Sequence, residues 1–128
     1  MINWQIFRVF YTMNAPLAKR NNIVELPTDN SAQIDEYKKL LVSVGKSNDR
    51  AAFSQVFEFF APKIKSFALA NPYGSNPSQF ADDLVQEVMI KVWNKASSYD
   101  PECAAASTWI FTIARNCRID MIRKLNRQ

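Results

Sequence analysis

The sequence contains no histidine among its 128 residues, and it has only two glycines and two cysteines. Without histidine, catalytic triads that use an imidazole, imidazole general bases and the usual histidine-bound metal sites are excluded. The scarcity of glycine, together with the lack of alternating apolar segments bounded by turn dipeptides, favours helices over a β-sheet. Cys103 and Cys117 are not in a CxxC spacing, so we expect two separate thiols in a reducing cytoplasm.

Motifs that would indicate an enzyme or a membrane protein are also missing. Phosphate-binding glycine loops, clusters of metal ligands and nucleophile–base sets do not occur. The apolar start, from Met1 to Met13, is interrupted by Arg8 and is too short to span a bilayer. It also lacks the basic region and the small-residue cleavage site of a secretory signal. We therefore expect a cytoplasmic protein that is not an enzyme, with no cofactor, no metal and no membrane insertion.

The sequence is rich in apolar residues, and its basic residues are clustered. Apolar residues make up 48% of the chain and aromatic residues 12%, a composition typical of globular proteins. The net charge is +4, and five of the basic residues lie between Trp109 and Gln128, where Asp120 is the one acid. Clustered positive charge of this kind indicates a polyanionic partner.

The chain is long enough for one domain of ordinary size. Residues 1–30 are the least interpretable part, because positions 14–30 combine two prolines with many polar residues and resemble a linker. The apolar start is either a short helix or the product of a start codon placed too early. We therefore predict a flexible N-terminal extension over 1–30 and an all-α domain over 31–128, a compact bundle of about four helices.

The spacing of apolar residues by three and four positions predicts each helix. Ser31 is the expected N-cap of the first helix, and Gly45 is expected to end it. Asn48 or Asp49 is expected to cap the second. The predicted core positions are Ile34, Tyr37, Leu40, Leu41 and Val44, then Ala52, Phe53, Val56, Phe57, Phe60, Ile64 and Phe67.

Three further expectations concern the boundaries of the later helices. Pro62 removes one backbone donor and should kink the second helix or split it near residues 60–61. The segment 71–79 should be a loop, which would leave Asp82 and Asp83 in the first turn of a third helix ending near Lys95. A second loop, 96–106, should precede a last helix that Ser107 caps and that runs to about residue 127. The inward positions of these two helices would be Leu84, Val85, Val88, Met89, Val92 and Trp93, then Ile110, Ile113, Ala114, Cys117, Met121 and Leu125.

Two segments in this order carry a family pattern: DDLVQEVMIKVW at 82–93, and STWIFTIARNCRIDMIRK at 107–124, entered through SSYDP at 97–101. Together they resemble region 2 of the sigma-70 family, specifically the extracytoplasmic-function (ECF) group. The resemblance covers roughly 47–127. It implies a protein that binds core RNA polymerase and that recognises and melts the promoter −10 element, with strand opening driven by binding free energy. Region 4, which follows in that group, is absent from this chain, so we expect a fragment or another route to promoter selection.

The resemblance assigns a polymerase-binding face to the helix that contains the first segment. Asp83, Gln86, Glu87 and Ile90 are spaced by three or four residues and share one side of that helix. In the family this side docks on the clamp coiled coil of the largest polymerase subunit. Charge pattern alone would favour a solvated helix face.

The resemblance also places the −10 contacts on the last helix. Its basic residues can neutralise phosphates, and Asn116 and Asp120, one turn apart, can form hydrogen bonds with base edges. The loop before it would help to form a pocket for a base extruded from the non-template strand, with Tyr99 exposed for stacking and Trp109 either exposed or in the core. The expected DNA-binding residues are Tyr99, Trp109, Arg115, Asn116, Arg118, Asp120, Arg123 and Lys124.

A second function remains open from the sequence. The chain would then be a truncated sigma-like interaction module that binds an anti-sigma factor or titrates core polymerase. An anti-sigma factor is an expected partner under either interpretation.

Overall fold

The computed structural model describes residues 30–128, with side chains from residue 36 onward. The expectation of a flexible extension over 1–30 therefore lies almost wholly outside the described residues. The elements are α2 (Asn30–Ser47), α3 (Arg50–Ala70), α4 (Pro77–Lys95), a 3-10 helix η1 (Ala96–Ser98) and α5 (Ala106–Asn126). This part of the chain contains four α-helices and no strand, which confirms the predicted all-α class.

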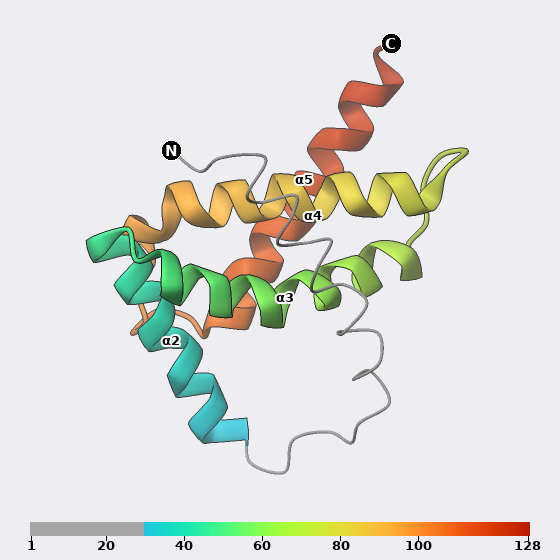
Figure 1. Cartoon of the computed structure of the whole chain (residues 1–128). Coiled ribbons are helices and arrows are strands. Elements are labelled where there is room, and N and C mark those ends of the chain that lie inside the picture. The colour runs from blue at the N-terminus through green and yellow to red at the C-terminus, as the bar shows by residue number, and fades with distance from the viewer. Residues whose placement is uncertain (1–29) are drawn as a thin grey trace.

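Helices α3 and α4 lie side by side and run in opposite directions (Figure 1). Helix α2 packs on α3 and on η1, at the end of the bundle where α4 finishes. Helix α5 packs mainly on α4, and its C-terminal end projects beyond that helix (Figure 1). None of the helices between residues 30 and 128 is long and apolar enough to cross a membrane.

A single apolar core joins the four helices, and the predicted stripes of α3 and α4 supply most of it. Among residues 36–128 no charged side chain is buried, and the buried ones are aliphatic, aromatic or, at Cys117, a thiol. Phe57 and Phe60 are both buried, as the periodicity of α3 predicts, whereas Phe67 and Trp93 are half-buried at its margin. The largest fully buried side chains are Leu41, Val44, Val56, Phe57, Phe60, Ile64, Leu84, Val85, Val88, Met89, Val92 and Ile110.

The predicted end of α2 at Gly45 is wrong. The helix begins at Asn30, one residue before the expected cap Ser31, and continues to Ser47. The residue after the helix, Asn48, terminates it: its φ is 50°, and its backbone N–H donates to the carbonyl of Val44 at 2.9 Å. Gly45 instead allows close packing, because a Cβ there would lie 2.4 Å from the carbonyl oxygen of Ala96 in η1.

The second helix is capped by Asp49, one of the two predicted residues. One carboxylate oxygen accepts the backbone N–H of Ala52 at 3.0 Å, and the other accepts the hydroxyl of Ser43 at 2.7 Å. These bonds, the one from Ala52 above all, lower the pKa of Asp49. The carboxylate therefore fixes the corner between α2 and α3.

Of the two outcomes predicted at Pro62, a kink or a split, the split does not occur: α3 is continuous from Arg50 to Ala70. Proline removes one helical hydrogen bond, but Phe60, Ala61 and Ile64 around it are all buried in the core. Most helix stability in proteins comes from packing of an apolar face, and that packing is intact on both sides of Pro62.

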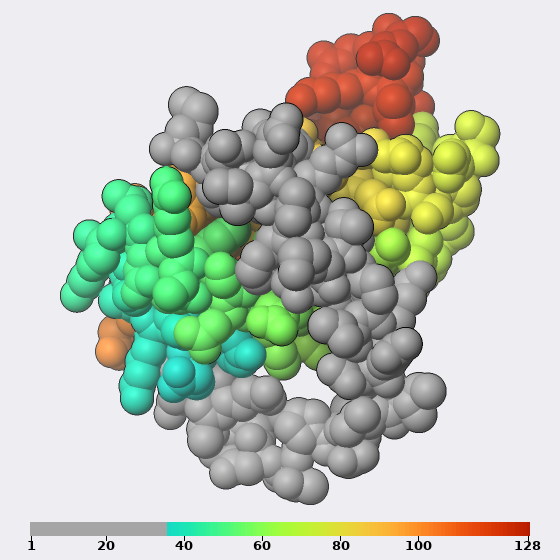
Figure 2. Space-filling model, viewed as in Figure 1, coloured from blue at the N-terminus to red at the C-terminus, as the bar shows by residue number. Residues whose placement is uncertain are grey.

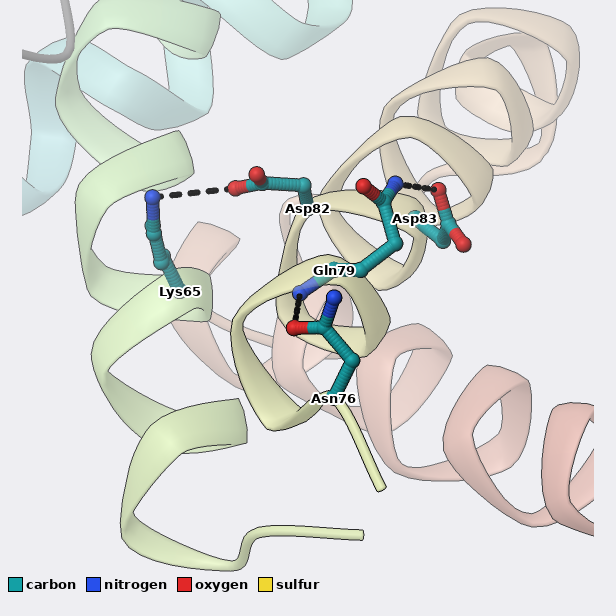
Figure 3. Close-up of polar contacts among 5 residues, drawn as sticks. All are labelled: Lys65, Asn76, Gln79, Asp82 and Asp83. Carbon is teal, nitrogen blue, oxygen red and sulfur yellow. Dashed lines mark hydrogen bonds and ion pairs between the residues drawn. The ribbon is translucent and has the colours of Figure 1, made fainter. Parts of the chain in front are cut away.

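Both later helices begin earlier than predicted. Helix α4 starts at Pro77, with Asn76 as N-cap accepting the backbone N–H of Gln79 at 3.2 Å (Figure 3). Asp82 and Asp83 consequently lie in its second turn and not in its first. Helix α5 starts at Ala106, and its N-cap residue, an alanine, offers no side-chain oxygen. The expected cap Ser107 is inside the first turn.

Candidate functional site

The four residues assigned to polymerase binding lie on one face of α4. The opposite side of this helix is buried at Ala81, Leu84, Val85, Val88, Met89 and Val92. Asp83 and Glu87 are exposed, and Gln86 and Ile90 are half-buried. The structure therefore brings the four together on the surface that the core leaves free, which we call the α4 face.

The N-terminal end of the α4 face is ordered by polar contacts (Figure 3). The side-chain amide of Gln79 donates to the carboxylate of Asp83 at 2.9 Å. On the neighbouring residue, the carboxylate of Asp82 pairs with the ammonium of Lys65 in α3 at 2.9 Å. Asp82 thus connects α4 to α3, and Asp83 remains on the surface.

The outer side of α5 presents most of the residues assigned to DNA. Ile110, Ala114 and Cys117 form its buried stripe. Ile113 and Met121 are half-buried, and Leu125, which was predicted to point inward, is 45% exposed. The exposed residues of the predicted set are Arg115, Asn116, Asp120, Arg123 and Lys124, so an amide and a carboxylate stand between cationic side chains.

Arg118 differs from the other basic residues of α5. Its side chain is half-buried, and one guanidinium nitrogen, Nη2, donates to the backbone carbonyl of Asn71 at 2.9 Å. The Nε atom is buried and has no hydrogen-bond partner within residues 30–128. The structure thus directs this arginine toward the body of the domain, whereas the sequence predicted a phosphate contact.

The expectation that Tyr99 is exposed is wrong, because the side chain is only 7% exposed. Its ring lies 5.2 Å from the ring of Trp109, and its hydroxyl donates to the carbonyl of Ala104 at 2.8 Å. Burial raises the pKa of Tyr99, and the nearby carboxylate of Asp100 raises it further. The loop folds back on itself, so Tyr99 supports Trp109, which is half-buried.

The loop itself is organised by Asp100. Its carboxylate accepts the backbone N–H of Glu102 at 2.9 Å and the thiol of Cys103 at 3.2 Å. The bond from Glu102, more than the one from Cys103, lowers the pKa of Asp100. Hydrogen bonding to the Asp100 carboxylate is in turn the main cause that raises the pKa of the Cys103 thiol. The loop before α5 is therefore a structured turn.

A groove of about 550 Å³ runs between α4 and the second half of α5. Glu87 of the α4 face lines it together with Asp120 and Arg123 of α5, so the two predicted sites share a border. The ammonium of Lys91 lies 3.9 Å from the Asp120 carboxylate, and Arg123 lies 4.0 Å from it. Lys91 was not among the site residues expected from the sequence, although it lies one helical turn after Glu87 and therefore shares that side of α4.

Comparisons with known proteins identify the family of the chain. The family model of sigma-70 region 2 matches residues 57–128. RpoE of Cereibacter sphaeroides, named as an ECF RNA polymerase sigma factor, is 46% identical over 97 residues, which cover 76% of this chain and 51% of that protein. SigK of Mycolicibacterium vanbaalenii, also named as an ECF sigma factor, is 32% identical over 44 residues, which cover 34% of this chain and 22% of that protein.

A solved structure is similar as well. The crystal structure of Rhodobacter sphaeroides SigE in complex with the anti-sigma ChrR contains a chain that is 39% identical, with a TM-score of 0.61. The match covers 69% of this chain and 55% of that one, so the chain spans about half the length of RpoE and of the SigE structure. These relatives are named as sigma factors and not as enzymes. The chain belongs to the sigma-70 family, and it contains region 2 of an ECF sigma factor.

Proposed function

We propose that this domain, residues 31–128, binds core RNA polymerase through the α4 face and recognises and melts the promoter −10 element through α5. The observation that carries the proposal is the outer side of α5, where Asn116 and Asp120 are exposed between arginines while the inner side is buried. In a family of sigma factors, such a surface is suited to single-stranded promoter DNA. The protein would act in the cytoplasm together with the polymerase.

The α4 face has the chemistry for docking on the clamp coiled coil of the largest polymerase subunit. Asp83 and Glu87 offer two exposed carboxylates, and Gln86 and Ile90 add an amide and an apolar contact. Carboxylates pair with arginines in short, charge-assisted hydrogen bonds. A polar rim around a small apolar contact is usual in protein interfaces that form and dissociate.

On α5, the polar and basic residues have separate roles. Asparagine can form two hydrogen bonds with adenine, and aspartate can accept from the amino group of cytosine. Arg115, Arg123 and Lys124 contact phosphates without regard to sequence. Trp109, half-buried at the start of the helix, is the aromatic ring available to stack on an extruded base, with Tyr99 packed behind it. Such stacking contributes about 1–3 kcal/mol per base.

The test is binding measured by fluorescence anisotropy at low salt. A short single-stranded oligonucleotide is first selected from a random library for tight binding, and it is then compared with the duplex of the same sequence. We expect the single strand to bind more tightly. Asn116→Ala should reduce discrimination between the selected sequence and its single-base variants, whereas the control Arg123→Ala should weaken all of them about equally. Equal affinity for single strand and duplex, with discrimination unchanged in Asn116→Ala, would contradict the melting function.

A second candidate function is a sigma-like module that binds an anti-sigma factor or titrates core polymerase. The similarity to a sigma factor solved with the anti-sigma ChrR supports it. Promoter opening by core polymerase, followed with the chain added in increasing amounts, separates the two functions. If promoter opening requires the chain, initiation is supported. If the chain inhibits the opening that another sigma factor drives, titration is supported.

A further inference from the structure

The second half of α5 has little apolar contact with the rest of the domain. After Cys117, every residue of this helix is exposed or half-buried. Figure 2 shows the end of α5 standing out from the body of the molecule. Apolar packing normally fixes the direction of a helix, and regions with few buried apolar contacts are the ones that move most easily. The direction of this half must therefore depend on other contacts.

Besides the longer ion pair of 3.9 Å between Lys91 in α4 and Asp120, two hydrogen bonds supply such contacts, and both come from the loop between α3 and α4, residues 71–76. The guanidinium of Arg118 donates to the carbonyl of Asn71 at 2.9 Å, and the hydroxyl of Tyr73 donates to the side-chain carbonyl of Asn126 at 2.6 Å. Arg118 and Asn126 stand at the two ends of the projecting half, roughly 12 Å apart along the helix axis. The loop thus contacts this half at both ends.

The loop is itself fixed to the body of the domain. At its start, Asn71 donates its side-chain amide to the carbonyl of Phe67 at 3.0 Å. At its end, Asn76 caps α4. Between them, the ring of Tyr73 lies 5.4 Å from the ring of Phe80, which is buried in α4. The loop can therefore transmit the position of α3 and α4 to α5.

We propose that Arg118 and Tyr73 are positioning residues for −10 recognition, which set the angle at which the projecting half of α5 meets DNA; this inference rests on the proposed function. Asp120 lies between the two attachment points, and Asn116 lies half a turn before the first. Hydrogen bonds to base edges need donor–acceptor distances of about 2.7–3.2 Å, so a small rotation of the helix breaks them. Long, flexible Arg and Lys side chains still reach phosphates after the same rotation.

This role makes a distinct prediction for Arg118. If the arginine contacted a phosphate, its removal would weaken binding to every sequence and would reduce the slope of log K against log salt by about 0.7 for a single strand. Removal of a positioning residue instead changes the ratio of affinities for the selected sequence and its single-base variants, and it leaves the salt slope unchanged. A loss of folded protein lowers both affinities by the same factor, so a purely structural role does not change that ratio.

The experiment compares Tyr73→Phe and Arg118→Gln with the unaltered chain, using the selected single-stranded oligonucleotide and its single-base variants over a range of salt concentrations. Tyr73→Phe removes only one hydroxyl and no charge. We expect the affinity ratio to fall roughly three- to tenfold in each variant, the effect of losing about one hydrogen bond, with an unchanged salt slope. Arg123→Gln is the matched control, and its slope should fall by about 0.7 with the ratio preserved.

Each outcome decides the matter. An affinity ratio at the level of the unaltered chain in either variant overturns the proposal. A salt slope that falls in Arg118→Gln as it does in Arg123→Gln also overturns it, since Arg118 would then be a phosphate contact. If the unaltered chain binds duplex as tightly as single strand, the proposed function fails and this inference fails with it. A clear single-strand preference with unchanged ratios in the variants removes only the inference.

Discussion

Replacing Gly45 by alanine tests the close approach of α2 to η1, the short helix that precedes the loop before α5. A Cβ at this position would lie 2.4 Å from the carbonyl oxygen of Ala96, 2.7 Å from its carbonyl carbon and 2.9 Å from the Cα of Ser97. All three are backbone atoms, so they cannot rotate away as a flexible side chain would. The substitution therefore requires α2 and η1 to separate.

Two opposing effects determine the size of the change. Alanine is better than glycine inside a helix by about 1 kcal/mol, because glycine loses more backbone entropy on folding. Extra volume in a packed interior costs about 1–3 kcal/mol, and a clash with three backbone atoms belongs at the upper end of that range. We therefore expect Gly45→Ala to lower the free energy of unfolding by about 1–2 kcal/mol, the net of these two effects.

The measurement is urea denaturation followed by circular dichroism. Ser66→Ala is the control, because Ser66 is exposed within α3 and its substitution adds helix propensity without a clash. The control should be stabilised by about 0.5 kcal/mol. Stabilisation of Gly45→Ala by about 1 kcal/mol, the value for propensity alone, would mean that α2 and η1 are further apart than the structure has them.

Three other predictions follow from the core, the corner between α2 and α3, and the α4 face. Truncation of Phe57 or Phe60 to alanine should cost about 3–5 kcal/mol in urea denaturation, and losses below about 1 kcal/mol for both would mean that the buried face of α3 is assigned wrongly. The pKa of Asp49 is lowered by its hydrogen bonds, so its stabilisation is complete above the ordinary value of 3.8 and is lost as pH falls through the lower folded value. The difference in stability between the unaltered chain and Asp49→Ala should thus be constant near neutral pH and become smaller in acid, where the carboxyl is protonated and its hydrogen bonds are weaker; a difference of the same size at low pH would contradict this. Glu87→Lys should weaken capture of core polymerase with helical content unchanged, and normal capture by both this variant and Gln86→Ala would exclude the α4 face.

The helices, most of the core and the family could be predicted from the amino-acid sequence alone. Helical periodicity is local, since the positions that must be apolar recur every three or four residues whatever the helix packs against. The stripe from Phe53 to Ile64 therefore identified the buried face of α3 directly. The same periodicity placed Asp83 and Glu87 on the α4 face and Asn116 and Asp120 on the outer side of α5. Their roles in binding remain predictions.

The contacts between segments that are distant in the chain could not be predicted in this way, because they form only when the helices pack. Gly45 was expected to end α2 because glycine is common just after helices. In the structure, a glycine is needed at this position because the backbone of Ala96 approaches it closely. Tyr99 looked exposed because it lies in a loop, but Trp109 covers it. Arg118 looked like a phosphate contact, but its partner is a carbonyl 47 residues away. The type of a residue and its spacing in the sequence do not identify such partners, because the distances between residues far apart in the chain are set only when the helices pack.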